Sequence, residues 1–276
     1  MPPTQDGPGR APTGSVFRVT HADYRVTMLK VGSGDVPGPE AFWMSHWDEW
    51  ITLDFQVALI RRPGVVALVN TGPAADLEPM NAGWVGFLGE RARFRRADGE
   101  FILDQLRTQG IAPEEVTHIL LTPLQLYTVS NVLAFPKALI HISKRGWRHL
   151  NETHQHPHDN RDTSVPPEIL TELVTTVWPR VVLLDDEEEI LPGLRTWWAG
   201  GHHRATYAVE VDTPAGVVVI SDAFFLLDNV LKNHPIGISE NIYESMAAHK
   251  RARLADIVLP LYDPQNFTRF PGGLVV

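Results

Sequence analysis

The stretch VTHILLTPLQLYTVSN, residues 116–131, joins a short apolar run to a threonine and then to a mostly polar segment. A run of this length, rich in branched aliphatic side chains and bounded by polar residues, is typical of a buried strand. A strand that ends at Thr122 delivers the side chains after it to an edge of its sheet. We therefore expect this segment to line a pocket, and its residue types decide what that pocket can do.

Strand-like runs recur on both sides of this stretch, and helical patterns separate some of them. The expected strands are Phe17–Val31, Phe55–Arg61, Val65–Val69, His118–Leu121, Ala138–Ile142, Val181–Leu184, Leu194–Trp198, Tyr207–Val211, Val217–Ile220 and Ile257–Pro260. Amphipathic spacing predicts helices over Gly99–Gly110, Pro166–Val177 and Ile242–Ala255. A turn signal in VDTPAGVVV, residues 211–219, predicts a hairpin. The pattern favours the α/β class, with two mixed sheets between helices.

With 276 residues, 43% of them hydrophobic, the chain is long enough to bury a full core. We expect one domain over residues 16–276 and a flexible arm over residues 1–15, which are rich in Pro, Gly and small polar side chains. The polar segment Trp147–Val165 is long for a loop and is predicted to be an insertion or a lid. DDEEE at residues 185–189 is predicted to be a solvated turn.

Charge and cysteine content exclude several classes of function. A net charge of −9 opposes binding to nucleic acid, and the densest basic cluster, RARFRR at residues 91–96, is expected to be a solvated face. The chain has no cysteine, which excludes disulfides, thiolate zinc sites and cysteine nucleophiles and fits a cytoplasmic protein. Without an apolar signal region or a run of 18 apolar residues, neither secretion nor membrane spanning is expected.

Several short motifs carry a family resemblance. The opening stretch, followed by FPKALIHISKRGW at residues 135–147, resembles the segment of the metallo-β-lactamase superfamily in which a strand ends in T-H-x-H-x-D-H and F-P-x-A follows. Four further motifs follow in the family's order. LVNTG at 68–72 resembles the L-x-D-T-G turn, and AGGHHRAT at 199–206 resembles the P-G-H-T-x-G loop. ISDA at 220–223 resembles the G-D-A strand end, and LPLYDP at 259–264 resembles the final P-G-H-D-P.

Within that superfamily, ENIYESM at residues 240–246 and RFPGG at residues 269–273 look most like the N-acyl-homoserine lactonase group. The resemblance spans residues 17–273 and implies an αββα sandwich. It also implies two divalent metals, which in this family polarise a carbonyl and generate a hydroxide nucleophile. Homodimers are common in the lactonase group, so the resemblance implies a possible homodimer as well.

The family's metal ligands are largely replaced in this sequence. Pro123 and Gln125 stand where the first two histidines belong, and Tyr127 and Thr128 stand where the Asp-His pair belongs. Tyr262 replaces the last histidine. Proline, threonine and glutamine are poor zinc ligands or none at all. No metal and no cofactor are therefore expected.

Two further replacements point in the same direction. Asn70 stands at the aspartate of the early turn, and Phe225 stands where this group places a substrate-binding tyrosine. His202 and Asp222 do match ligand positions. They could form a hydrogen-bonded acid/base dyad, or His202 could simply be a satisfied remnant bonded to Asp222.

Other residues keep two interpretations each. Trp43 and Trp47 could line an apolar ligand pocket, or they could belong to the core or to a dimer contact. His149, His154, His156 and His158 could form a surface metal site or be solvated loop residues. Neither Ser130 nor Ser221 lies in a G-x-S-x-G or S-x-x-K motif, which disfavours a serine hydrolase.

Three hypotheses remain. The first is a metal-independent protein, a small-molecule binding protein or pseudoenzyme, whose ligand is acyl or lactone-like and contacts Pro123, Gln125, Thr128 and Phe225. The second is a metal-free lyase, isomerase, cyclase or esterase in which His202 is the base, Asp222 orients it, and Tyr127 or Tyr262 donates to an oxyanion. The third is a metal-dependent hydrolase with a rebuilt ligand shell that recruits His202, Asp222 and histidines of residues 149–158.

Overall fold

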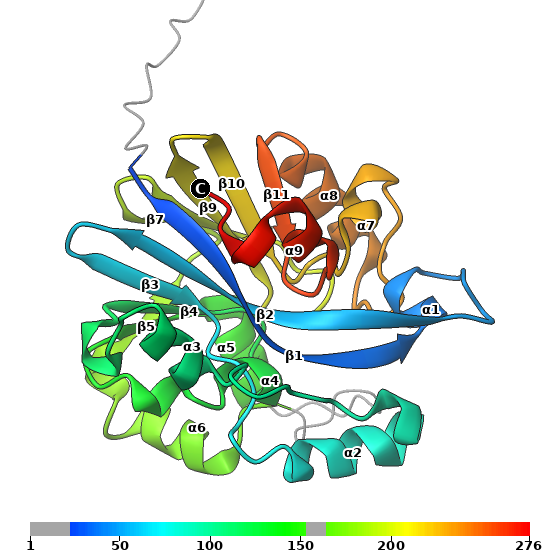
Figure 1. The fold of residues 1–276 in the computed structure, drawn as a ribbon, viewed down its shortest axis with the longest axis horizontal. Helices are drawn as coiled ribbons and strands as arrows, with labels where there is room; N and C mark the ends of the chain where they lie inside the picture. Colours follow the sequence, from blue (N-terminus) through cyan, green and yellow to red (C-terminus); the bar gives the residue numbers. More distant parts are fainter. Residues whose placement is uncertain (1–22, 153–163) are drawn as a thin grey trace, which may run out of the picture.

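The computed structural model of the protein describes residues 23–152 and 164–276, and these residues form two stacked sheets with helices outside them (Figure 1). The first sheet has six strands in the order β1 to β6: Arg25–Pro37, Trp50–Arg62, Val65–Val69, His118–Leu121, Leu139–Ser143 and Val181–Leu184. The second has five strands in the order β11-β10-β9-β8-β7; from β7 to β11 they are Glu187–Leu191, Leu194–Trp198, Tyr207–Thr213, Gly216–Ser221 and Ile257–Pro260.

Both sheets are mixed. In the first, β1, β2 and β3 pair antiparallel, whereas β3 to β6 are parallel. In the second, β7 to β10 pair antiparallel, and β10 pairs parallel with β11. The hairpin expected at residues 211–219 is present: β9 and β10 meet at a turn in which the hydroxyl of Thr213 donates to the carbonyl of Gly216.

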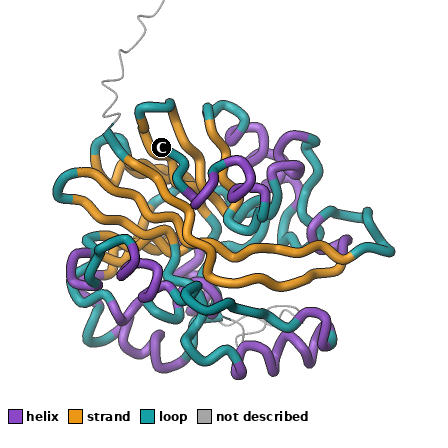
Figure 2. Tube along the Cα trace, in the orientation of Figure 1, coloured by secondary structure: helices purple, strands orange, loops and turns teal. Residues whose placement is uncertain are grey.

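Helices lie between some of the strands along the chain, whereas β6 to β10 follow one another without a helix (Figure 2). From α1 to α9 they are Gly38–Ala41, Glu78–Leu88, Ile102–Thr108, Leu126–Val129, Lys144–Asn151, Pro167–Val174, Leu227–Leu231, Ile242–Ala252 and Gln265–Arg269. Short 3₁₀ turns lie at Glu90–Ala92, Pro113–Glu115, Val132–Ala134, Trp178–Arg180 and Pro271–Gly273. Helices α3 and α6 lie on one side of the sheets, and α7 and α8 lie on the other (Figure 1).

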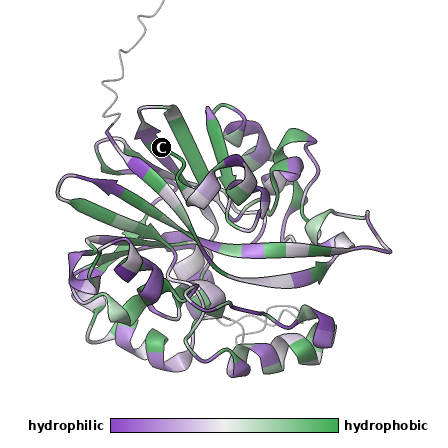
Figure 3. Cartoon of the chain, viewed as in Figure 1, coloured by the Kyte–Doolittle hydropathy of each residue, from purple (hydrophilic) through white to green (hydrophobic). Residues whose placement is uncertain are grey.

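The alternating side chains of the strands divide the core into two parts. Along β10, Val218 and Ile220 belong to the main core, whereas Val219 points to the opposite face and packs with Ala248 and Ala252 of α8. This period of two is the usual consequence of a pleated strand. The strands are accordingly among the most hydrophobic parts of the chain (Figure 3). The structure confirms the predicted layers, with two sheets between helices.

Some local predictions were wrong. Residues 187–189 are not part of a turn but belong to β7, the edge strand paired with β8. Residues 147–151, assigned to an insertion or lid, are the last part of α5. Both segments are polar because they lie at the surface, which hides their periodicity. Residues 1–15 and residues 153–163, where the rest of the predicted lid falls, lie outside the described residues. No helix in the described ranges is long and apolar enough to cross a membrane.

Candidate functional site

The predicted site residues come from the ends of several strands. Thr122 follows β4, Asp222 follows β10, and Tyr262 lies two residues after β11. His202 lies in the loop between β8 and β9. Because the carboxyl ends of β4 and β10 face the same region between the sheets, Thr122 and Asp222 meet although they are a hundred positions apart. The structure thus brings Asp222, His202, Tyr127, Tyr262 and Phe225 into one cluster.

The carboxylate of Asp222 lies at the centre of this cluster and is fully buried. Oδ1 accepts a hydrogen bond from the hydroxyl of Thr122. Oδ2 accepts from the hydroxyl of Thr206 at 2.7 Å and lies 2.9 Å from Nδ1 of His202. Hydrogen bonds of this kind offset the cost of burying a carboxylate. Both oxygens of Asp222 are therefore engaged by protein donors.

Thr122 and Thr206 belong to this cluster, although they were not among the predicted site residues. The Thr122 hydroxyl also contacts the backbone of Tyr207, accepting from its nitrogen at 3.0 Å. Asn70, in the left-handed conformation with φ 70°, holds the backbone of Thr122 through both atoms of its side-chain amide, at 2.8 Å each. Asn tolerates this conformation better than most residues. The only sequence signal for Thr122 was its place at the end of an apolar run.

His202 is neutral in this environment. Its ring is 3% exposed, and burial, together with the neighbouring His203, lowers its pKa to about 4 in spite of the bond to Asp222. Because a carboxylate only accepts, the ring proton lies on Nδ1, and Nε2 carries a lone pair. Nε2 makes no hydrogen bond to any residue that the structure describes. The arrangement has the form of a His-Asp dyad, with its base enclosed in the core.

Aromatic rings fill the rest of the cluster. Tyr262 is 2% exposed and packs against Phe225, Phe55 and Tyr127, with ring centroids 5.0, 4.9 and 6.3 Å away. The ring of His202 lies edge-on to Phe225 at 4.9 Å. Burial raises the pKa of both tyrosine hydroxyls, which therefore stay protonated. The hydroxyl of Tyr262 has no hydrogen-bond partner of normal geometry among the described residues.

The segment after β4 has a structural role. The hydroxyl of Thr128 donates to the carbonyls of Pro123 and Gln125, at 2.6 and 2.7 Å. The same hydroxyl accepts from the backbone nitrogen of Gln125 at 3.2 Å. The side chain of Thr128 thus holds the turn that begins α4, the helix that carries Tyr127. These bonds occupy Thr128, but they leave the side-chain amide of Gln125 free of hydrogen bonds to described residues.

The donor set does not fit a dinuclear metal site. Asp222 is the one carboxylate of the cluster, and His202 uses Nδ1 to bind it. Proline has no donor atom in its side chain, and the phenols at positions 127 and 262 stay protonated. In the part of the chain that the structure describes, no three His, Asp or Glu side chains come together in a way that could hold a metal ion.

Other predicted site residues lie apart from this cluster. Trp43 and Trp47 are at the surface, 45% and 65% exposed, and neither makes a ring contact with the cluster. The backbone of Trp43 is bound to Pro235 and to the ring of His234. Of the four histidines in the predicted surface site, His149 belongs to α5, and the others lie outside the described residues.

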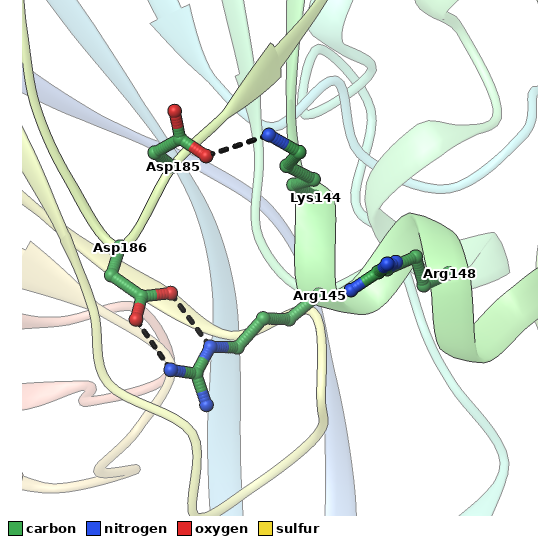
Figure 4. Close-up of a pocket in the computed structure, with 5 residues that line it drawn as sticks. All are labelled: Lys144, Arg145, Arg148, Asp185 and Asp186. Carbon is green, nitrogen blue, oxygen red and sulfur yellow. Dashed lines mark hydrogen bonds and ion pairs between the residues drawn. The ribbon is translucent and has the colours of Figure 1, made fainter.

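A surface depression away from the cluster is lined by charged side chains. It measures about 570 Å³ and is lined by Lys144, Arg145, Arg148, Asp185 and Asp186. Lys144 binds Asp185, and Arg145 binds Asp186 (Figure 4). A second cavity, of about 30 Å³, lies closer to the cluster and is bordered by Gln125, His203 and Glu240. None of the five residues of the cluster lines either of these two cavities.

Neither a family model nor a curated protein matches the sequence. Solved structures do match the fold. An N-acyl homoserine lactone hydrolase, solved with the product N-hexanoyl-L-homoserine at its catalytic metal centre, aligns over 91% of this chain and 98% of its own, with a TM-score of 0.74 and 14% identity. The chain has the metallo-β-lactamase fold.

Two further matches agree with this fold. The dizinc quorum-quenching lactonase AidC, in complex with the same type of product, covers 91% of this chain and 90% of its own, with a TM-score of 0.64 and 16% identity. The hydrolase AbOPH of the β-lactamase superfamily covers 95% and 93%, with a TM-score of 0.60 and 15% identity. At such identities the likeness concerns the fold alone. The sandwich is therefore lactonase-like, and its chemistry must be argued from its own residues.

Proposed function

We propose that this protein is a metal-independent small-molecule binding protein, a pseudoenzyme that uses a lactonase-like sandwich without a two-metal centre. The observation that carries the proposal is that both carboxylate oxygens of Asp222 are hydrogen-bonded to other side chains. A carboxylate that bridges two cations needs both oxygens for them, whereas Thr122, Thr206 and His202 bind these oxygens here. The packing of Tyr262 against Phe225 supports it, because these rings fill the space between the sheets beside His202.

The ligand belongs to the same proposal. The lactonases of similar fold hold acyl-homoserine products. By analogy we propose an acyl or lactone-like small molecule that approaches Pro123, Gln125, Thr128 and Phe225. Gln125 is the member of this set whose polar side chain is available, because Thr128 is engaged with the backbone and Pro123 and Phe225 offer only apolar surface.

Metal content tests the proposal directly. Untagged protein, purified without chelator, is analysed for metals before and after incubation with excess zinc, manganese or iron(II) and desalting. We expect far less than one equivalent in every sample. A stoichiometric metal, together with lactone hydrolysis that a strong chelator abolishes, would overturn the proposal and restore the metal-dependent hydrolase with a rebuilt shell.

A second candidate function is a metal-free enzyme that uses the dyad. The free lone pair on Nε2 of His202 favours it, since Asp222 holds the ring in the tautomer that a general base requires. The low pKa and the burial of the ring oppose it, because a base works best with a pKa near the working pH. If turnover of an ester or lactone is found without metal, His202→Gln should abolish it while the circular dichroism spectrum stays unchanged. Turnover that survives His202→Gln would reject the dyad.

A further inference from the structure

The cavity of about 30 Å³ lies between α5 and the loop of residues 199–206, next to the packed cluster. This volume has room for about two water-sized groups. Leu124 and Ala205, both buried, form an apolar part of its wall. The polar part of the wall is formed by Gln125, His149, Ser164, His203, Arg204 and Glu240. The cavity therefore has the composition of a small ligand site, with apolar walls and a few convergent polar groups.

Glu240 supplies a fixed negative charge to this cavity. Burial raises its pKa, but the hydrogen bond from Arg204 and the nearby ring of His203 outweigh that effect and lower the pKa to about 2. Oε2 is bound by Nε of Arg204. Oε1 lies 3.7 Å from Nδ1 of His203, a distance longer than a normal hydrogen bond. One oxygen of an ionised carboxylate therefore remains able to accept a strong bond.

The guanidinium beside it is not available to a ligand. Arg204 binds Glu240 through Nε and Glu244 through Nη1 and Nη2, at 3.2 and 2.7 Å for the last two. Two carboxylates thus share one guanidinium. An anionic ligand would meet the charge of Glu240 and find Arg204 already occupied. A cation is favoured for both reasons.

The free hydrogen-bonding groups also fit a cation. Glu240, Gln125 and His203 border the same small space, and their side chains can each supply an acceptor there: a carboxylate oxygen, an amide carbonyl and a ring nitrogen. The amide of Gln125 makes no hydrogen bond to a described residue, and the helix cap there does not use it. An ammonium group carries three N–H donors and matches three acceptors. A neutral amide would satisfy Gln125 but leave the charge of Glu240 unmatched.

We infer that this cavity binds the ammonium group of a small primary amine. The inference rests on the proposed small-molecule function and names the polar group by which the ligand is held. The site is separate from the cluster around Asp222, and it uses side chains that the cluster leaves free. The rest of the ligand would extend from the ammonium group past Gln125.

Methylammonium is the probe, because its two heavy atoms match the volume. Acetate and acetamide serve as anionic and neutral probes of similar size, all titrated at constant ionic strength. Binding is followed by NMR on the ring protons of His203 and the side-chain amide of Gln125. We expect saturable shifts with methylammonium and a dissociation constant on the order of 10 mM, near the limit for so small a ligand. Saturable binding of acetate instead, or identical linear shifts with all three probes, would overturn the inference.

Two variants test the acceptors. Glu240→Gln removes the charge at constant shape and should weaken methylammonium binding at least about tenfold. Gln125→Leu should weaken it as well, without touching the contacts of Arg204. Glu114→Gln, an exposed carboxylate in the 3₁₀ turn Pro113–Glu115, is the matched control and should bind as the wild type does. Binding that survives both site variants would overturn the inference even if Glu240→Gln alone loosens the loop.

Metal analysis of the same samples separates the two proposals. If the protein contains no metal and does not bind methylammonium, the ammonium site is contradicted, whereas the proposed metal-independent function is not. A metal-loaded protein contradicts the proposed function, whatever its response to the probe.

Discussion

Phe225 and Tyr262 meet edge to face, with ring centroids 5.0 Å apart and ring planes at 88°. The resemblance to lactonases places a substrate-binding tyrosine and a metal-binding histidine at these two positions. A phenylalanine offers no hydrogen bond, and a buried phenol keeps its proton. The two rings therefore contribute apolar contact area between the sheets, which agrees with the proposed metal-independent function.

The bond from Thr122 to Asp222 predicts a loss of stability. Thr122→Val removes a hydroxyl from a fully buried carboxylate and should lower the free energy of unfolding by about 2 kcal/mol. Urea denaturation at neutral pH measures the change. Thr108→Val is the control, because the Thr108 hydroxyl bonds to its own helix at the surface. If the two variants unfold at the same urea concentration, Thr122 does not support Asp222.

Two buried tyrosines should respond differently to loss of the hydroxyl. Tyr207 donates to the carbonyl of His141 at 3.2 Å, and Tyr207→Phe should cost about 1 kcal/mol. The hydroxyl of Tyr262 interacts with that of Tyr127 but makes no hydrogen bond of normal geometry in the described part of the chain, so Tyr262→Phe should change stability by less than about 0.5 kcal/mol. Thermal or urea unfolding compares the pair. A larger loss from Tyr262→Phe would reveal a bond to that hydroxyl.

Three buried histidines predict acid sensitivity. Burial lowers the pKa of His141, His202 and His249 to about 4, and all three are at most 3% exposed. Below pH 6.5 these histidines bind protons in the unfolded chain but not in the folded chain. The free energy of unfolding should therefore fall as the pH drops from 6.5 toward 4, by up to about 3 kcal/mol for each ring. Burial raises the pKa of Glu40 to about 7, which opposes this trend for one group.

The measurement is the free energy of unfolding in urea between pH 8 and pH 4.5. His249→Leu, which replaces a ring without hydrogen bonds among the described residues, should flatten the acid slope. A profile that is flat from pH 7 to pH 4.5 in the wild type would show that these rings are not held neutral by the fold.

The contact between α5 and the loop that contains His202 predicts that position 146 requires glycine. A Cβ on Gly146 would lie 2.3 Å from the Cα of Ala205, so Gly146→Ala should displace this loop and cost at least about 2 kcal/mol. Gly83 lies within α2, with open space around its Cβ position, and Gly83→Ala should stabilise the protein by about 0.5 kcal/mol. Thermal unfolding of both variants checks the signs. A tolerated Gly146→Ala would place the loop farther from α5.

The sequence predicted the core strands well because their signal is local. Val65–Val69, His118–Leu121, Val181–Leu184 and Ile257–Pro260 have the predicted bounds, since each is a short apolar run with polar or turn residues at its ends. The edge strand β7 was missed because it begins with three glutamates, of which Glu187 and Glu189 are exposed, and such a run resembles a loop. Helix α5 was missed for a similar reason, as its residues are mostly basic or polar.

The sequence by itself therefore determined the layered sandwich and the chemical identity of the replaced positions, because strand periodicity and motif order are properties of neighbouring residues. Only the tertiary structure decided that Thr122 and Thr206, from different strand ends, both donate to Asp222. It also decided that Tyr262 packs against Phe225 and that Glu240 and Gln125 border the same small cavity. Such contacts depend on how the two sheets are stacked. A local sequence pattern does not determine the distance between residues that are far apart in the sequence.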